Sequence, residues 1–307
     1  MKIILDDYIP IFLKDSEYDL LNNNDDIFFK KDIDYRSSDD DDVYVINWGE
    51  NLSGVKHGII ETGFFFDAAH IDTRGLYNFS SFNYSDFYQH VESLDCPITS
   101  KELFRQGKIK QKFKQPHENI DWNGVGLVCQ YPNDRSVLKA GSKKDYYTFI
   151  ERAAKFYGKK LFLKLHPINN NEEKDFLWKI VSPYGCEIDR TNTDSFINSE
   201  FVLLYNSTIL PDLILRNIPV AQYAPGYFWQ SGAVSFTNNN IPSNVPFSGA
   251  IQDYTIRFCD FLIWKYCFHN KLSISDKTEM VRTFAYSDNM FPLMPQHSYA
   301  QYLINQG

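Results

Sequence analysis

Short apolar segments alternate with helix-like segments from residue 125 to residue 224, and no other feature of the 307-residue chain constrains the fold as strongly. Four apolar runs have the length of buried strands and lie at 125–130, 160–167, 200–206 and 218–224. The segments between them are predicted to be helices, at 143–158, 172–185 and 207–217. Because strands that alternate with helices form βαβ units, this half predicts a parallel, doubly wound α/β sheet.

The first half of the chain carries fewer regular signals. Strands are predicted at the N-terminal MKIIL and over 43–49 and 57–66. A polar, basic segment from about 100 to 122 is predicted to connect two domains. We expect a first domain, a second domain and a C-terminal helical segment, at 1–115, 120–270 and 271–307.

Composition excludes several classes of protein. No apolar run reaches the roughly 18 residues that a membrane helix needs, and the N-terminus lacks the long apolar region of a signal peptide. The five cysteines are scattered and form no Cys-x-x-Cys pair, so neither a disulfide framework nor a zinc site is indicated. We therefore expect a reduced, cytoplasmic setting.

The charge balance narrows the range of partners. A net charge of -8 disfavours general binding to nucleic acid, which needs a positive surface, and strong attraction to anionic lipid. The densest charged run, 39–42, could bind a divalent cation, but it lacks the glycine and carbonyl spacing of a calcium loop. We favour a solvated loop for this run.

Polar side chains follow three of the predicted strands in the second half. They are Gln130, Asp134 and Ser136, then Lys164 and His166, then Asn206, Ser207 and Thr208. The carboxyl ends of parallel strands meet at one edge of a sheet, where open α/β sheets bind their ligands. We therefore expect one site built from the three clusters, although each cluster alone could be a polar turn, a packed histidine or a helix cap.

The third cluster has a direct chemical use. A helix N-terminus offers unpaired backbone N–H groups and the positive end of a dipole, and the hydroxyls of Ser207 and Thr208 would add donors. The predicted helix start at 207 is therefore a candidate phosphate site. His166 would lie beside it and could donate a hydrogen bond to a phosphate oxygen.

The order of these pieces resembles the capsule-polysaccharide Kdo transferases, which are retaining, CMP-Kdo-dependent enzymes of the GT-B fold. The second half carries QYPNDRS (130–136), KLHP (164–167), STILPDLILRNIPVAQY (207–223) and PGYFW (225–229). The first half carries ETGF (61–64) and DTRGLY (72–77). The resemblance implies two Rossmann-like domains with parallel sheets facing a central cleft, and a C-terminal segment that returns to the first domain.

The same resemblance implies roles for individual residues. Asp134 matches the family's catalytic aspartate, framed by Gln130 and Ser136. His166 matches the histidine that contacts the donor phosphate, and Glu61 matches the acidic residue that acts as base toward the acceptor.

The remaining expected donor-binding positions come from both lines of reasoning. Ser207 matches a phosphate-binding serine, and Asp212 stands where the family has glutamate in its nucleotide-binding helix. The strand-end argument adds Lys164, Asn206 and Thr208. The sequence departs from the family at 65–66, where arginine is usual, and at 210–211, where glycine is usual.

The residue types support this chemistry independently. Sugar transfer passes through an oxocarbenium-like transition state, and retention of configuration requires a nucleophile opposite the leaving group. Asp134 could provide that nucleophile while His166 and the 207 segment receive the charge of departing CMP. No Asp-x-Asp motif ends a strand in this half, so we expect no metal and no cofactor beyond the CMP-Kdo substrate.

Three functions stay open at this stage. They are a Kdo transferase, a transferase of another CMP-activated ulosonic acid such as a sialic acid, and a catalytically inactive sugar-nucleotide-binding subunit. The expected partners are a CMP-sugar donor and a saccharide or glycolipid acceptor of the capsule-polysaccharide or lipopolysaccharide kind. We expect no nucleic acid and at most peripheral association with the inner face of the cell membrane.

Overall fold

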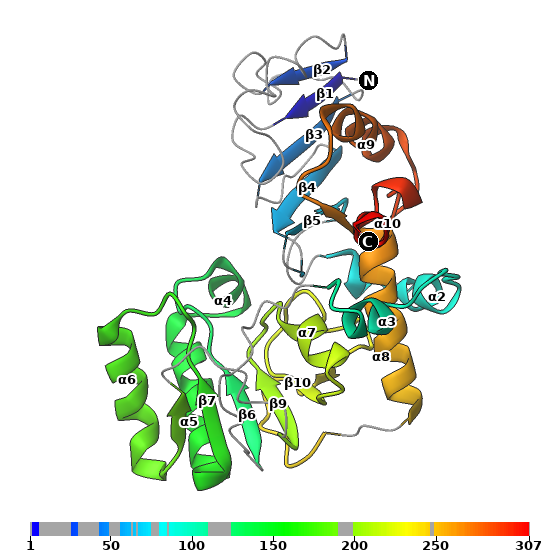
Figure 1. The fold of residues 1–307 in the computed structure, drawn as a ribbon. Helices are drawn as coiled ribbons and strands as arrows, with labels where there is room; N and C mark the ends of the chain where they lie inside the picture. Colours follow the sequence, from blue (N-terminus) through cyan, green and yellow to red (C-terminus); the bar gives the residue numbers. More distant parts are fainter. Residues whose placement is uncertain are drawn as a thin grey trace. The chain divides into compact units, whose positions relative to one another are not determined.

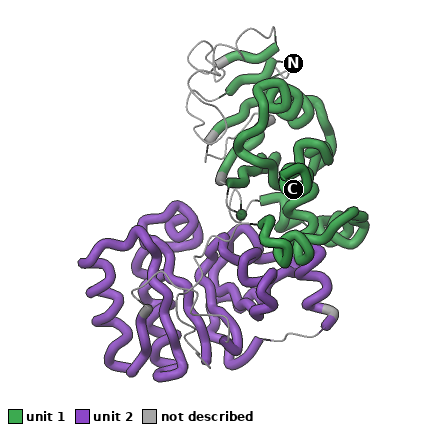
Figure 2. Tube along the Cα trace, in the orientation of Figure 1, with its two compact units in different colours: residues 1–110, 258–307 green, residues 111–257 purple. Residues whose placement is uncertain are grey.

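The structure, a computed structural model, describes residues 2–5, 26–29, 43–48, 56–62, 64–65, 67–74, 80–84, 86–109, 124–189, 199–245 and 249–306. The chain divides into two compact units (Figure 2). Unit 1 comprises Met1–Lys110 and Phe258–Gly307, and unit 2 comprises Gln111–Arg257. The acidic run at 39–42 and residues 110–122 of the connection predicted at about 100–122 lie outside the described residues.

The chain passes from unit 2 back to unit 1 inside helix α8 (Gly249–Phe261), where unit 1 resumes at Phe258. The sequence prediction placed the start of the C-terminal segment later, at 271. Because α8 is one continuous helix across the boundary, no turn or change of composition marks this position in the sequence.

The sheet of unit 2 is entirely parallel, with the order β11-β10-β9-β6-β7-β8. Figure 1 labels its four central strands, β10, β9, β6 and β7. Its strands are β6 (Val125–Val128), β7 (Leu161–Lys164), β8 (Glu187–Asp189), β9 (Phe201–Leu204), β10 (Val220–Gln222) and β11 (Ser235–Phe236). Followed from β8, the strands have the doubly wound order 3-2-1-4-5-6. The order reverses between the neighbours β6 and β9, which therefore form the switch point of the sheet.

The helices of unit 2 cover this sheet. The α-helices that lie wholly within the described part of unit 2 are α4 (Arg135–Ala140), α5 (Lys143–Tyr157), α6 (Asn171–Val181) and α7 (Leu210–Leu215). Helix α5 starts with a capping box between Ser142 and Asp145, and it buries Tyr146 and Phe149 against the sheet. The helix predicted at 143–158 is thus confirmed.

The helix predicted at 207–217 is shorter than expected. Helix α7 begins at Leu210, its N-cap residue is Ile209, and Pro211 stands in its first turn. Pro is favoured there because its fixed φ fits the first helical turn and its missing N–H has no partner to lose. The prediction that Ser207 caps this helix is therefore wrong, since Ser207 and Thr208 precede the helix in a turn.

The sheet of unit 1 has the order β12-β5-β4-β3-β1-β2. Its strands are β1 (Lys2–Leu5), β2 (Ile27–Phe29), β3 (Val43–Trp48), β4 (Lys56–Thr62), β5 (Ala68–Asp72) and β12 (Cys267–His269). Strands β1 to β4 pair in parallel, as predicted, whereas β5 and β12 are antiparallel additions. The segment 63–67 between β4 and β5 is too short for a parallel crossover.

Aromatic and aliphatic side chains fill the core of unit 1. Helix α9 (Ile274–Tyr286) packs Met280, Val281 and Phe284 into the same cluster as the sheet residues. Helices α2 (Phe87–Glu92), α3 (Ser100–Arg105) and α10 (Tyr299–Asn305) complete the unit. Among the described residues, no helix is both long enough and apolar enough to span a membrane.

Candidate active site

Gln130 and Asn206 meet at the switch point of the unit 2 sheet. Val128 pairs with Leu204 in the register of β6 and β9, so Gln130 and Asn206 each stand two residues beyond a paired position. Gln130 Nε2 donates to Asn206 Oδ1 at 3.0 Å, and Asn206 N donates back to Gln130 Oε1 at 3.1 Å. The two strand ends are thereby joined at the edge where this class of sheet binds ligands.

A second set of hydrogen bonds carries this link to Asp134. Gln130 Nε2 also donates to Ser136 Oγ at 3.0 Å, and Ser136 Oγ donates to Asp134 Oδ1 at 2.6 Å. Ser136 N donates to the same carboxylate oxygen at 2.7 Å, because Asp134 is the N-cap of α4. Asn206 Nδ2 fixes the other side of the loop by donating to Ser136 O at 2.8 Å.

The turn that precedes Asp134 is also defined. Asp134 N donates to Tyr131 O at 2.9 Å, which closes a four-residue turn with Pro132 at its second position. Both side-chain bonds of Asp134 use Oδ1, and within the described part of the chain Oδ2 has no hydrogen-bond partner. Asp134 is exposed, so one oxygen of its carboxylate is held by the protein and the other faces solvent.

The residues of the candidate site differ in solvent exposure. Gln130, Ser136 and Asn206 are only 6%, 6% and 1% exposed. Asp134 is exposed, and His166, Ser207 and Thr208 are half-buried. The three buried polar side chains hydrogen-bond to one another, as buried polar groups generally do.

Tyr146 and Gly226 support this network and were not assigned to the site from the sequence. The fully buried Tyr146 hydroxyl accepts from Gln130 N at 2.7 Å and donates to Gln130 O at 3.1 Å. A Cβ at Gly226 would lie 2.7 Å from Asn206 Cβ, so only glycine allows this approach. Gly226 belongs to the motif PGYFW (225–229), which was noted in the sequence. The same segment contacts Asn206 a second time, because Asn206 Nδ2 donates to Pro225 O at 3.1 Å.

His166 lies near enough to Asp134 for the two side chains to interact electrostatically, and its surroundings favour the neutral imidazole. Burial lowers the pKa of the imidazole below its ordinary value, and the nearby Asp134 carboxylate partly opposes that shift. Nδ1 of His166 accepts from Ile168 N at 3.3 Å, so the proton of the neutral ring resides on Nε2. The ring therefore presents an N–H donor through Nε2.

The other predicted donor-site residues occupy the same edge of the sheet. Lys164 ends β7 and is buried, and its carbonyl accepts from Cys129 N at 2.8 Å. Ser207 Oγ accepts a long bond from Ile209 N at 3.4 Å, within the turn that leads into α7. Asp212 lies in the first turn of α7 and is 1% exposed.

Glu61 belongs to unit 1 and is described there. It is half-buried, one residue before the end of β4, and pairs with His70 of β5. The His70 ring is fully buried and stacks against both Phe64 and Tyr266, with both centroid distances at 4.9 Å. Glu61 thus stands on a strand end that is supported by a packed aromatic core.

One group of side chains in the described residues has the types and spacing of a metal site. The ligand atoms of Asp276, Glu279 and His297, in unit 1, lie within 4.8 Å of one another. Glu279 bonds His297 Nε2 at 3.1 Å, and Asp276 Oδ2 accepts from the capping residue Ser273. Hydrogen bonding and helix capping account for this arrangement without an ion.

Comparison with known proteins finds similar structures but no similar sequences. No protein-family model matches the chain, and no curated protein is significantly similar to it in sequence. The β-Kdo 2,7 transferase of KpsC from Thermosulfurimonas dismutans aligns with 92% of this chain and 98% of its own, with a TM-score of 0.54 and 12% identity. This chain has the fold of a β-Kdo transferase.

The β-Kdo 2,4 transferase of KpsC from the same organism aligns over the same fractions, with a TM-score of 0.49 and 10% identity. The GT-B-like α/β fold expected from the motif order is confirmed by the 2,7 transferase. In this chain the hydrogen-bonded cluster around Asp134 occupies the switch point of the unit 2 sheet.

Proposed function

We propose that the chain is a glycosyltransferase that moves Kdo from CMP-Kdo to a saccharide acceptor with retention of configuration. The observation that carries the proposal is the relay from Asn206 through Gln130 and Ser136 to Asp134 Oδ1, at the switch point of the sheet. This relay fixes the carboxylate of an exposed aspartate beside a neutral histidine. The β-Kdo transferase fold supports the same assignment.

Asp134 is assigned as the nucleophile. Its Oδ2 attacks the anomeric carbon C2 of the donor, and the bond from C2 to the phosphate oxygen breaks, with its electron pair leaving on CMP. The acceptor hydroxyl then attacks the same carbon from the vacated face and releases the Asp134 carboxylate. Two inversions give net retention, and both transition states carry oxocarbenium character that a carboxylate stabilises.

His166, Ser207 and Thr208 are assigned to the departing phosphate. The Nε2–H of a neutral imidazole is a donor, and a donor aimed at a leaving oxyanion stabilises the charge that develops there. The two hydroxyls contribute from the turn before α7 and not from a helix cap. Since CMP leaves with charge on a single phosphate, the proposal assigns no metal.

The buried polar residues are assigned to positioning. Gln130, Ser136 and Asn206 are each 6% exposed or less, and their hydrogen bonds hold the loop that carries Asp134. Their proposed role is to orient the Asp134 carboxylate before the donor binds. The buried Lys164 and Asp212 are assigned to the donor side of the same edge, next to the nucleotide.

Glu61 is assigned as the base that takes the proton of the acceptor hydroxyl. Its place at a strand end of unit 1 suits a residue that meets a second substrate. A glycolipid acceptor of the capsule or lipopolysaccharide kind would bring the protein to the inner face of the cell membrane as a peripheral, cytoplasmic enzyme.

The test is the release of CMP from purified donors. The purified chain is incubated with CMP-Kdo or with CMP-activated sialic acid, with and without a Kdo-bearing oligosaccharide, and free CMP is measured by chromatography. Release from CMP-Kdo alone among the donors supports the proposal. Release only from the sialic acid donor moves the assignment to another ulosonic acid, and binding of CMP-Kdo without release indicates an inactive subunit.

A further inference from the structure

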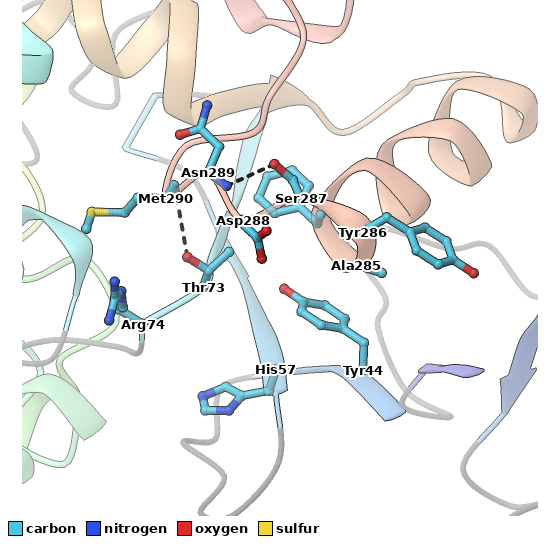
Figure 3. Close-up of a pocket in the computed structure, with 11 residues that line it drawn as sticks. Tyr44, His57, Thr73, Arg74, Ala285, Tyr286, Ser287, Asp288, Asn289 and Met290 are labelled. Atoms are coloured by element: carbon cyan, nitrogen blue, oxygen red, sulfur yellow. Dashed lines mark hydrogen bonds between the residues drawn. The ribbon is translucent and has the colours of Figure 1, made fainter. Parts of the chain in front are cut away.

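Unit 1 contains a pocket of ≈ 450 Å³ that none of the assigned residues lines (Figure 3). This volume falls within the range of about 300–1,000 Å³ typical of small-molecule sites. Its polar lining comes from three parts of unit 1: Tyr44 and His57 on β3 and β4, Thr73 and Arg74 after β5, and Asp288 and Asn289 after α9.

The pocket lies at the opposite edge of the unit 1 sheet from Glu61. Tyr44 and His57 stand near the first residues of β3 and β4, whereas Glu61 stands near the last residue of β4. Arg74 follows the end of β5, which runs antiparallel to β4 and so returns to the same edge as His57. His57 and Glu61 are four positions apart on β4, about 13 Å at the usual rise.

Tyr44 lines this pocket and carries a buried hydroxyl. The residue is 5% exposed, and its Oη has no hydrogen-bond partner within the described part of the chain. Burial and the nearby Asp72 carboxylate raise its pKa, so the phenol remains a protonated donor. A Cβ at Gly58 would lie 2.8 Å from this oxygen, so glycine leaves the room that the hydroxyl occupies.

The pocket lining carries one positive and one negative side chain, Arg74 and Asp288. Arg74 is exposed, and its guanidinium lies 5.0 Å from the centre of the Tyr84 ring, which steadies the cation at the pocket rim. Asp288 is an exposed carboxylate whose side chain points toward the Tyr44 hydroxyl in Figure 3. The pocket thus offers one cation, one anion and a buried neutral donor.

The loop that carries Asp288 is held in place by its own hydrogen bonds. Thr73 Oγ1 donates to Met290 O at 3.3 Å, and Asn289 N donates to Ser287 Oγ at 3.0 Å, as the dashed lines in Figure 3 show. Asn289 Oδ1 accepts from Phe291 N at 3.0 Å. The Asp288 wall is therefore tied to the strand end that carries Arg74.

We propose that this pocket binds a single carboxylated sugar residue. The guanidinium of Arg74 pairs with the sugar carboxylate, and Asp288 accepts from sugar hydroxyls. Tyr44 donates to a ring or hydroxyl oxygen and gains the partner that its buried oxygen lacks. A nucleoside diphosphate fits less well, because its diphosphate carries at least two negative charges and would meet a single arginine beside an aspartate.

The biological role that we assign to this pocket rests on the proposed function. A transferase that builds a Kdo-bearing saccharide needs to hold the chain that it extends, and a site for a sugar acid away from Glu61 would hold a residue other than the one that reacts. Binding of the sugar acid itself depends only on the pocket.

The test is calorimetric titration of the full chain, saturated with CMP, with the methyl β-glycoside of Kdo and with the same glycoside carrying a neutral amide in place of its carboxylate. We expect binding of the acid and at least about tenfold weaker binding of the amide. Arg74→Gln should weaken binding of the acid about tenfold or more, and Tyr44→Phe about fivefold. Arg105→Gln, an exposed arginine of the same unit outside the pocket, is the matched control and should bind as the parent does.

The outcomes separate this proposal from the proposed function. Equal affinity in the parent, Arg74→Gln and Tyr44→Phe chains would overturn the pocket assignment, and so would the absence of any binding of the acid. A chain that binds the acid through Arg74 but releases no CMP from CMP-Kdo would remove the transferase proposal and leave the pocket assignment standing. Arg74 is exposed, so Arg74→Gln tests the pocket without endangering the fold.

Discussion

Gln130 and Asn206 exchange two hydrogen bonds, of 3.0 and 3.1 Å, across the point where the strand order of the unit 2 sheet reverses. This exchange ties together the loops that follow β6 and β9. One further hydrogen bond, from Gln130 to Ser136, connects the pair to the Asp134 carboxylate. The orientation of an exposed acid is therefore set by amides that solvent does not reach.

Ser136→Ala tests whether that orientation matters for turnover. The substitution removes the Oγ donor to Asp134 Oδ1 and leaves the bond from the backbone N–H. A hydrogen bond to a charged group is worth about 1.5–3 kcal/mol, so kcat should fall about 10- to 100-fold while KM for the donor changes little. Ser136→Thr, which restores the hydroxyl, should recover part of kcat. An unchanged kcat in Ser136→Ala would mean that Ser136 only caps α4.

Tyr146→Phe tests the support behind Gln130. Loss of the hydroxyl leaves a buried N–H and a buried carbonyl of Gln130 without their partner, which should cost about 1–3 kcal/mol of unfolding free energy. Tyr84→Phe is the matched control, because that residue is 40% exposed and the loss of its hydroxyl should cost less. Urea unfolding of both variants gives the comparison, and equal losses would contradict it.

Gly226→Ala tests the close approach between the 225–229 segment and Asn206. The new Cβ would lie 2.7 Å from Asn206 Cβ, so one of the two segments must move. We expect a loss of about 1–3 kcal/mol in stability together with lower turnover. Gly249→Ala is the control, because nothing lies within 4 Å of its Cβ position, and that variant should keep the stability and turnover of the parent. A neutral Gly226→Ala would show that the segment yields easily.

His166 gives a prediction about pH. Because its pKa is lowered in the folded chain, the unfolded chain binds more protons between that lowered value and the ordinary value of about 6.5. Stability should therefore rise with pH through this window and be lost as the pH falls through it. Unfolding free energies at about pH 7.5 and pH 5.5 should differ less in His166→Gln than in the parent. An equal pH dependence in both chains would place the imidazole in solvent.

The same histidine reports on its distance from Asp134. The Asp134 carboxylate raises the pKa of His166 against the effect of burial, so Asp134→Asn should lower that pKa further. Titration of the imidazole signals by NMR in both chains measures the shift. No change would mean that the two side chains do not interact.

His166→Ala tests the catalytic role of the ring. Loss of one donor to a developing oxyanion typically costs about 10²-fold or more in turnover. Unchanged turnover of CMP-Kdo by this variant would make His166 a structural residue.

Four of the six strands of unit 2 were predicted within a few residues, because strands buried on both faces form short apolar runs that end in Gly, Pro or polar residues. The short strands β8 and β11 were not predicted. Strand β12 was not predicted. The tail segment Cys267–His269 becomes a strand by pairing with β5, about two hundred residues earlier in the chain, and no local pattern records such a partner. The start of α7 was predicted too early, because a serine before an apolar run resembles a cap even where the chain turns first.

The residues around Asp134 could be named from the sequence, but their connections could not. Which amide donates to which oxygen depends on the register of β6 against β9, and that register is a property of the assembled sheet. The division into buried and exposed members follows from the same packing. The sequence suggested Gln130 and Asn206 as donor-binding residues, whereas their burial favours a positioning role.

The central claim is that Asp134 forms a covalent bond to the transferred sugar. Intact-protein mass spectrometry after mixing the enzyme with CMP-Kdo, in the absence of acceptor, tests it directly. We predict an adduct of one Kdo residue that maps to the peptide containing 127–137. In Asp134→Asn the adduct and sugar transfer should both be lost, while CMP still binds. An Asp134→Asn enzyme that transfers Kdo at close to the parent rate would contradict the account.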